Sequence, residues 1–369
     1  MDKLSKILHE RVDTRSTLPN VTPLYQCSSF FAESDYFYTR KANPNTTELE
    51  QVLKTLEGCE FAGMVTTGMA AISMALRFLK PKDHLIVDRL IYGCTYKLFQ
   101  DFCAHYDLGL DFVDLTNAEW VRSISPQTRM VFFETPTNPF LKTIPIETIR
   151  RQADQIKSGI LLVVDNTWAT PLFQRPLTLG ADLCVYSATK FYSGHSDCMG
   201  GVISTNRNDL AETISQIRFL SGGILDPHSA WLIRRSMQTF RLRMQEHERV
   251  IKKMASFLHA QAEIERVYLP EVGGQLEGYG CILFCELKEQ FEANVDRFLS
   301  GLSLFERGTS MASVVSAVAQ PYFGSHLTLS PEEKKQMGIK PTLIRLCFGL
   351  EEISDLIDDL KTALRRLHD

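Results

Sequence analysis

Residues 183–190 read LCVYSATK, an apolar run that ends in two hydroxyl side chains and a lysine. The apolar part is typical of a buried strand. Ligands of open α/β sheets bind beyond the carboxyl ends of the strands, where Ser187, Thr189 and Lys190 would lie. A lysine at such a place can form an imine with an aldehyde cofactor, and hydroxyls beside it can bind a phosphate. The alternative is an ordinary surface lysine after a strand.

A second apolar run, residues 161–164, leads to Asp165. A buried aspartate needs a cationic partner, and a protonated pyridine nitrogen would be one. Asp165 and Lys190 lie 25 residues apart, which is the separation of one βα unit. We therefore expect both side chains at the same edge of one sheet. The alternative for Asp165 is a helix N-cap.

A third candidate is the Thr/Gly turn at residues 66–71, TTGMAA, which opens a helical stretch. Free backbone N–H groups and the positive end of a helix dipole suit a phosphate. Most such turns only cap helices, so this motif is weak by itself.

Apolar strand-like runs alternate with helical stretches from about residue 46 to residue 221. Strands are expected at 84–88, 130–135, 160–166, 183–189 and 199–205, and helices at 68–79, 92–105 and 145–158. This alternation predicts a mostly parallel sheet that is covered by helices on both faces.

The flanking segments have other patterns. Residues 1–45 show little periodicity and contain three prolines, which indicates an extended arm. Asp226 and Pro227 predict the start of a long helix that runs to about Leu258. Strand-like runs at 281–287 and 343–348, an irregular stretch at 308–330 and an amphipathic helix at 353–367 follow. We therefore expect three parts: an arm (1–45), a large domain (46–225) and a smaller C-terminal domain (226–369).

The composition argues against several classes of protein. The chain of 369 residues is long enough for two domains, and its net charge of −4 offers no basic surface to nucleic acid. The N-terminus lacks the apolar core of a signal peptide, and no apolar run reaches the ~20 residues of a membrane span, so we expect a cytoplasmic protein without a membrane partner. The nine cysteines show no CxxC spacing, which argues against disulfides and metal sites. We expect Cys281 and Cys285 to be buried in the core.

Several motifs along the chain share their order and spacing with one family. They are YTRKANPNT at 38–46, YGCT at 92–95, ETPTNP at 134–139, DNT at 165–167, SATK at 187–190, GHSD at 194–197 and RLCFGLE at 345–351. Together they resemble the Cys/Met-metabolism enzymes that use pyridoxal 5'-phosphate (PLP), among them cystathionine γ-synthase, cystathionine γ- and β-lyase, methionine γ-lyase and the O-acylhomoserine sulfhydrylases. The resemblance covers nearly the whole chain. It implies fold type I of the PLP-dependent transferases, an α/β fold with a mostly parallel seven-stranded sheet between helices and a smaller α+β C-terminal domain.

The resemblance implies that PLP is the cofactor and gives each matching residue a role. Lys190 would hold PLP covalently and later move protons. Asp165 would pair with the pyridinium, Asn138 would hydrogen-bond the phenolic oxygen, and Tyr92 would stack on the ring and exchange protons. The phosphate would be held by the N–H groups of Gly68 and Met69 and by the hydroxyls of Ser187 and Thr189.

The resemblance also implies a substrate site that two chains share. Arg345 would grip the α-carboxylate of an amino-acid substrate as a bidentate fork. Tyr38 and Arg40, in the arm, would reach the phosphate of the neighbouring subunit. This predicts a homodimer, commonly paired into a homotetramer, with shared active sites.

The chain departs from the family pattern near the substrate. The family's Ser-Leu-Gly-Gly-x-Glu-Ser segment aligns with residues 310–316, where Ser310 is retained and the glycines and the glutamate are replaced. Relatives that use cystathionine have acidic residues where this chain has Phe37 and Thr309. The distal ammonium of cystathionine would therefore find no carboxylate at these positions.

Two residues near Tyr92 give opposing indications. Cys94 stands where methionine γ-lyases have cysteine and most of the family has glycine. Lys97 stands where cystathionine γ-synthases often have arginine, and a cation there could meet an acidic leaving group. The alternatives are a small residue tolerated at a helix start for Cys94 and a solvated helix lysine for Lys97.

We interpret the chain as a PLP-dependent carbon–sulfur lyase or trans-sulfuration enzyme. The reaction would be elimination or replacement at Cγ of a methionine- or homoserine-type amino acid, and Cys94, Phe37 and Thr309 favour a γ-lyase. Cystathionine γ-synthase, O-acylhomoserine sulfhydrylase and β-lyase activities remain alternatives. Transamination and a non-catalytic PLP-binding protein are the alternatives outside this group.

Overall fold

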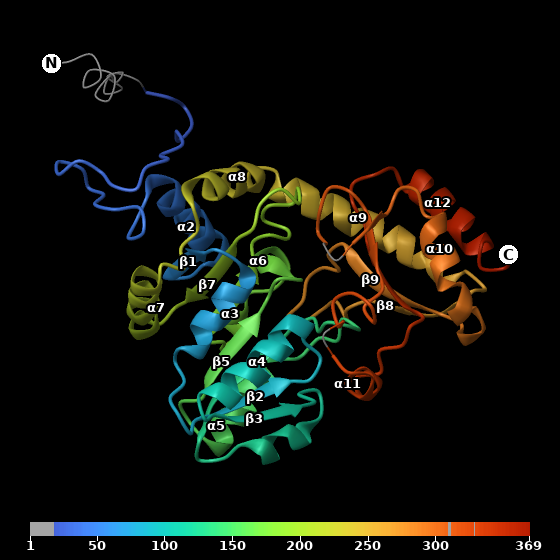
Figure 1. Ribbon diagram of the computed structural model, residues 1–369, viewed down its shortest axis with the longest axis horizontal. Coiled ribbons are helices and arrows are strands. Elements are labelled where there is room, and N and C mark those ends of the chain that lie inside the picture. Colours follow the sequence, from blue (N-terminus) through green and yellow to red (C-terminus); the bar gives the residue numbers. More distant parts are fainter. Residues whose placement is uncertain (1–17, 309–310, 328) are drawn as a thin grey trace.

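The computed structural model describes residues 18–308, 311–327 and 329–369, and two sheets dominate it (Figure 1). The larger sheet has seven strands in the order β1-β7-β6-β5-β4-β2-β3. The strands are β1 (Phe61–Val65), β2 (His84–Asp88), β3 (Gly109–Val113), β4 (Thr128–Glu134), β5 (Leu161–Asp165), β6 (Leu183–Ser187) and β7 (Gly201–Thr205). Neighbouring strands run parallel except β7, which is antiparallel to both β6 and β1.

The sequence-based strands are confirmed to within two residues at each end. Strands β2, β4, β5 and β6 are apolar and nearly fully buried, as expected for central strands of a parallel sheet. Strands β1 and β3 were not predicted. They lie at the two sheet edges, and each is a five-residue strand that contains a glycine.

Helices connect and cover the strands of the large sheet. They are α2 (Pro44–Glu57), α3 (Gly68–Leu76), α4 (Gly93–His105), α5 (Ile146–Ile156), α6 (Thr170–Phe173) and α7 (Asn208–Ser221), with short 3₁₀ turns at Ala118–Ser123 and Pro176–Leu179. Helices α3 and α7 both pack against β1 and β7, and α3 also packs against β6.

The long helix expected from Pro227 is interrupted. Asp226 caps it as expected, because its carboxylate accepts the N–H of Ser229 at 2.9 Å. Helix α8 (Pro227–Met237) ends after eleven residues, and two residues separate it from α9 (Phe240–His259). The Ser236 carbonyl accepts the Thr239 N–H and hydroxyl, each at 3.2 Å, and the Arg243 guanidinium at 3.2 Å. These local bonds replace the regular helical pattern and turn the chain.

The second sheet has five strands in the order β10-β11-β12-β9-β8. The strands are β8 (Ile264–Tyr268), β9 (Ile282–Leu287), β10 (Glu306–Arg307), β11 (Ala317–Ala319) and β12 (Leu343–Cys347), and the helices around them are α10 (Val295–Gly301), α11 (Pro331–Gln336) and α12 (Ile353–Arg365). Helix α9 contributes to both hydrophobic cores: Met244 belongs to the core of the large sheet and Val250 to that of the second sheet. The boundary at residue 226 stays a prediction.

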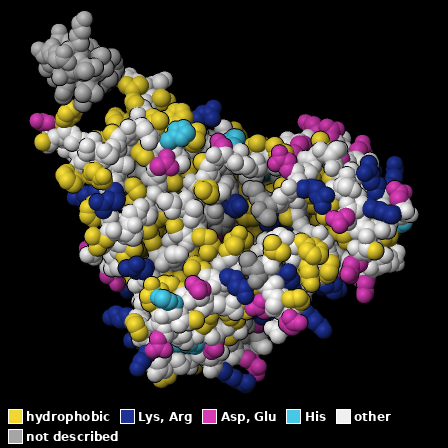
Figure 2. All heavy atoms as spheres, in the orientation of Figure 1, with side chains coloured by type: hydrophobic (Ala, Val, Ile, Leu, Met, Phe, Trp, Pro, Cys, Tyr) yellow, Lys and Arg dark blue, Asp and Glu magenta, His cyan; other side chains and the backbone are white. Residues whose placement is uncertain are grey.

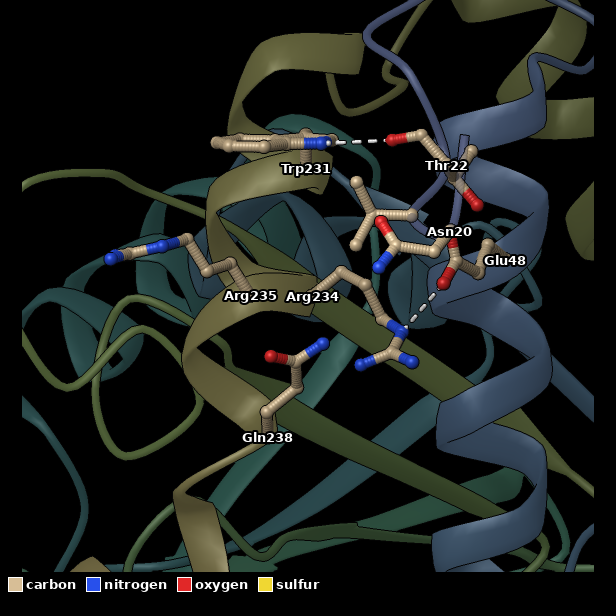
Figure 3. A pocket seen from close by; sticks show the side chains of 8 residues that line it. Asn20, Thr22, Glu48, Trp231, Arg234, Arg235 and Gln238 are labelled. Atoms are coloured by element: carbon tan, nitrogen blue, oxygen red, sulfur yellow. Dashed lines mark hydrogen bonds and ion pairs between the residues drawn. The ribbon is translucent and has the colours of Figure 1, made fainter. Parts of the chain in front are cut away.

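The described part of the arm, from residue 18 to α2, extends away from the body (Figure 1). Its base is fixed by Asn45, which donates to the Pro23 carbonyl and accepts the Tyr25 N–H, both at 2.8 Å. Figure 3 shows a pocket where Thr22 accepts the Trp231 indole N–H at 3.1 Å and Arg234 pairs with Glu48 at 2.8 Å. Beyond this base several apolar side chains of the arm, such as Phe31 and Phe37, are exposed, and Figure 2 shows apolar side chains on this part of the surface at the upper left.

Two negative findings concern the residues that the structure describes. No helix among them has the length and hydrophobicity needed to cross a membrane. In the same residues, no three His, Cys, Asp or Glu side chains come together in a way that could bind a metal ion.

Candidate active site

A cavity of about 470 Å³ lies at the carboxyl edge of the large sheet. Glu134, Asp165 and Ser187 end the adjacent strands β4, β5 and β6, so the parallel arrangement brings all three to this edge. The cavity is lined by Thr67, Gly68, Met69, Ile72, Tyr92, Thr95, Glu134, Asn138, Asp165, Thr167, Trp168, Ser187, Thr189, Lys190, Met199, Met311 and Arg345.

Lys190 follows β6 in a tight turn, and its N–H donates to the Ser187 carbonyl at 3.2 Å. Burial and the nearby Arg345 guanidinium lower the pKa of the Lys190 amine. A lower pKa increases the fraction of neutral amine, which is the form that attacks an aldehyde and accepts a proton. The turn thus presents a nucleophilic lysine to the cavity.

Asp165 lines the cavity, and hydrogen bonds hold one of its carboxylate oxygens in place. Its Oδ1 accepts the Thr167 N–H at 2.9 Å and the Thr167 hydroxyl at 2.6 Å. Burial raises the pKa of Asp165 to about 6, although the bonds from Thr167 oppose this. A cation in the cavity would stabilise the ionised form, so this position fits a protonated pyridine nitrogen.

Close packing of α3 against β6 forms a cradle for an anion. Thr67 caps α3 by accepting the Ala70 N–H at 3.0 Å, and the Gly68 and Met69 N–H groups occupy the first turn. A Cβ at Gly68 would lie 2.8 Å from the Ser187 Cβ, so only glycine allows this approach. The helix N-terminus and the hydroxyls of Ser187 and Thr189 thereby face one cavity, and together they suit a phosphate.

Tyr92 and Asn138 approach the cavity from the loops after β2 and β4. Burial and Cys94 raise the pKa of the Tyr92 hydroxyl to about 12, so this hydroxyl keeps its proton at neutral pH. The buried Asn138 Oδ1 has no hydrogen-bond partner within the described residues. An unpartnered buried amide is costly, and a polar ligand in the cavity would satisfy it.

Arg345 enters the cavity from β12 of the second sheet and is only 4% exposed. Burial lowers the pKa of Arg345, while Cys347, Cys281 and Tyr92 raise it. The two cysteine sulfurs are 3.4 Å apart, and Cys347 accepts the Ala312 N–H at 3.0 Å. Ala312 adopts φ 65°, a left-handed conformation that suits the glycine of the family pattern better.

The arm residues Phe37, Tyr38 and Arg40 are not in this cavity. Arg40 Nη1 donates to the Phe219 carbonyl at 2.6 Å, and its guanidinium lies 4.5 Å from the Phe219 ring centroid. Phe37 is 73% exposed. Thr309 and Ser310 lie outside the described residues.

Cys94 and Lys97 lie on helix α4, and neither of them lines the cavity. The Cys94 thiol is exposed and interacts with the Tyr92 hydroxyl. Lys97 Nζ lies 3.0 Å from Gln100 Oε1 and 3.5 Å from Glu333 Oε1, and Glu333 also forms the capping box of α11. The charge of Lys97 is therefore matched by a carboxylate of the second sheet's domain.

Sequence reasoning assigned no role to several residues of the cavity wall, namely Glu134, Thr167, Trp168 and Met311. Glu134 stands inside the quoted ETPTNP motif and ends a strand, as Asp165 does, and this was an available signal. Met311 belongs to a loop whose position relative to the large sheet depends on contacts distant in sequence. The local sequence around Met311 therefore did not indicate that it would line the cavity.

Comparisons with known proteins agree with this geometry. The family described as Cys/Met metabolism PLP-dependent enzyme matches residues 5–365. The L-methionine γ-lyase of Fusobacterium nucleatum subsp. polymorphum is 37% identical, over 94% of this chain and 93% of that protein. The cystathionine γ-lyase of Bacillus subtilis (strain 168) is 34% identical, over 94% of each. The structure of cystathionine γ-synthase from Xanthomonas oryzae pv. oryzae with aminoacrylate and cysteine has a TM-score of 0.89 at 31% identity, over 94% of this chain and 93% of that one.

Proposed function

Because this chain belongs to the Cys/Met-metabolism family of PLP-dependent enzymes, we propose that it catalyses γ-elimination from a methionine-type amino acid. The observation that carries the choice is the charge distribution of the cavity wall. Its ionisable side chains besides Tyr92 are Lys190, Arg345, Glu134 and Asp165. Lys190, Arg345 and Asp165 are assigned below to the cofactor or to the α-carboxylate, so they do not compensate a charged substrate tail. Much of the remaining wall is apolar: Met69, Ile72, Trp168, Met199 and Met311. A neutral thioether tail suits such a wall better than the distal ammonium and carboxylate of cystathionine.

We assign the cofactor contacts as follows. Lys190 would hold PLP covalently, Asp165 would pair with the pyridinium, and Asn138 would hydrogen-bond the phenolic oxygen. The N–H groups of Gly68 and Met69 and the hydroxyls of Ser187 and Thr189 would hold the phosphate. When bound, PLP withdraws electrons from the substrate α-carbon and thereby acidifies its C–H bond.

The protein groups then move protons and hold the substrate. Once the substrate's amino group has displaced it from the cofactor, the neutral Lys190 amine would remove the proton from Cα, and a second deprotonation at Cβ would expel the γ-substituent. The Tyr92 hydroxyl, which is protonated at neutral pH, donates to the leaving sulfur. Arg345 binds the α-carboxylate with a planar fork and so fixes the substrate beside Lys190. Burial strengthens this charge-assisted contact because water does not screen it.

A γ-replacement reaction is the second candidate, and Lys97 is the residue that would favour it. Lys97 already interacts with Gln100 and Glu333, so its positive charge is less available to attract an acidic leaving group. This observation supports the lyase over a synthase that uses succinyl or phosphoryl esters. The same side chains can also serve β-elimination from a shorter substrate.

We further propose that two chains complete each active site in a homodimer, which pairs into a homotetramer. The exposed apolar side chains of the arm, such as Phe31 and Phe37, support this proposal because a partner would cover them. Tyr38 and Arg40 would then reach the phosphate site of the neighbouring chain, and Phe37 would border its substrate.

Product analysis tests the proposed reaction. The purified protein should release 2-oxobutyrate and a thiol from methionine, and it should use cystathionine at least about a hundredfold less well in kcat/KM, because an unpaired buried charge costs several kcal/mol. Pyruvate from cystathionine or cysteine would indicate β-elimination instead. A new thioether formed from an O-acylhomoserine and cysteine, with no 2-oxobutyrate from methionine, would replace the lyase by the synthase.

A further inference from the structure

Three carboxylates stand side by side at the carboxyl edge of the large sheet. Asp88, Glu134 and Asp165 each end one of the neighbouring strands β2, β4 and β5. Asp88 uses both oxygens, which accept the N–H groups of Leu90 and Leu115 at 2.8 and 2.9 Å. The proposed function assigns Asp165 to the pyridine nitrogen and gives Glu134 no role.

Glu134 is bonded on one side only. Its Oε1 accepts the backbone N–H of Tyr92 at 2.8 Å, whereas its buried Oε2 has no hydrogen-bond partner within the described residues. The side chain is 2% exposed and lines the cavity together with Tyr92 and Asp165. A fully ionised carboxylate in this position would leave a buried anionic oxygen without compensation.

We infer that Glu134, in its uncharged form, is a positioning residue that holds Tyr92 beside the cofactor. The inference rests on the proposed function, because it requires Tyr92 to act at the cofactor. Oε1 fixes the backbone at Tyr92, the residue that opens α4 and has no side-chain cap of its own. The uncharged carboxyl leaves Asp165 as the anion that faces the ring.

The turn at Tyr92 and Gly93 is also constrained on the side that faces away from Glu134. A Cβ on Gly93 would overlap the Ser325 carbonyl oxygen, so the turn is held closely between Glu134 and the loop at Ser325. With its acceptor removed, the Tyr92 N–H would be buried and unpaired, and the turn would shift to find another partner. A shift of this turn moves the Tyr92 ring and hydroxyl together.

The electrostatic surroundings favour the uncharged form. Glu134 is the direct register partner of Asp165 on the adjacent parallel strand, so their side chains point to the same face. Burial raises the pKa of Glu134, and so do the carboxylates of Asp165 and Asp88, while the hydrogen bond from the Tyr92 N–H opposes them. An uncharged carboxyl keeps a carbonyl oxygen that accepts the same N–H bond.

Two substitutions of Glu134 distinguish the need for a hydrogen-bond acceptor from the need for a negative charge. Glu134→Gln keeps a neutral oxygen acceptor, so kcat, KM and cofactor retention should stay within about twofold of the parent. Glu134→Leu removes the acceptor, so kcat should fall at least about tenfold, which corresponds to the loss of one buried hydrogen bond. The visible circular dichroism of the bound cofactor should weaken in Glu134→Leu and stay unchanged in Glu134→Gln. Asp101→Asn, at an exposed position of α4, is the control and should leave the cofactor dichroism unchanged.

A double-mutant cycle with Tyr92→Phe tests whether Glu134 acts through Tyr92. In the Tyr92→Phe background, Glu134→Leu should reduce kcat by less than about threefold, because the hydroxyl that it misplaces is already absent. An equal loss in both backgrounds would overturn the inference. If Glu134→Leu does not fold, Glu134→Gln provides the test, with the charge-reversed Glu134→Lys as its comparison. The uncharged form would be refuted if Glu134→Gln lost as much kcat and cofactor dichroism as Glu134→Lys. A parent protein that binds PLP but does not act on any sulfur amino acid would refute the proposed function and leave the dichroism test of Glu134 intact.

Discussion

Glu57, the last residue of α2, gives the sharpest prediction about stability. The side chain is 1% exposed, and neither carboxylate oxygen has a hydrogen-bond partner within the described residues. Burial raises the pKa of Glu57 from 4.5 to about 8, and the nearby Tyr186 hydroxyl and Arg175 guanidinium offset only part of this. Glu57→Gln keeps the volume and removes the ionisation.

The size of the effect follows from proton linkage. Between pH 4.5 and about 8 the folded state holds a proton on Glu57 that the unfolded state has released. Stability therefore falls as the pH rises through this window, at up to 1.36 kcal/mol per pH unit, which amounts to about 5 kcal/mol across it. Glu57→Gln has no such loss, so its advantage over the parent should grow from pH 5 to pH 8.

Thermal unfolding of parent and variant, measured at half-unit steps from pH 5 to pH 8.5, checks this reasoning. One kcal/mol moves the midpoint of a domain of 150–250 residues by about 2–4 °C. The two midpoints should therefore differ far more at pH 8 than at pH 5, by about 10 °C in favour of the variant. Glu60→Gln, at an exposed position three residues further on, is the control and should follow the parent. A gap between Glu57→Gln and the parent that stays constant with pH would refute the argument.

Three further predictions concern the site. Borohydride should fix PLP to the peptide that contains Lys190, and Lys190→Ala should abolish turnover with the fold retained; mass spectrometry of a label on another lysine would contradict this. Inactive Arg40→Ala and Lys190→Ala chains, mixed and reassembled, should recover part of the activity, because one site of a mixed dimer combines both intact residues; mixed oligomers without activity would argue against a shared site. Lys97→Ala should change kcat/KM for methionine by less than about threefold, because Glu333 already pairs with it at the surface; a selective loss on O-succinylhomoserine would instead support the synthase.

The sequence predicts the central sheet well, because the sheet depends on local pattern. The residues proposed to hold the cofactor line one cavity, and their roles stay predictions. Apolar runs that end in Asp165 and Ser187 give the strand and the position of its polar end together. The break at Gln238 escapes such reasoning, since it arises where Arg243 reaches back to the Ser236 carbonyl. The partner of Lys97 is equally hidden, because Glu333 follows it by 236 residues. Several side chains of the arm are exposed, so packing within the chain does not fix their positions.

The pairing of β1 with β7 has a consequence for synthesis on the ribosome. Phe61 pairs with Thr205, so 144 residues separate the two strands of this ladder. At a synthesis rate of ~5–20 residues per second, β1 waits about 7–30 s for its partner. Throughout that interval an apolar strand with open N–H and C=O groups is available to other nascent chains. The side of β1 that pairs with β7 in the finished protein is thus open to misassembly while the chain is being made.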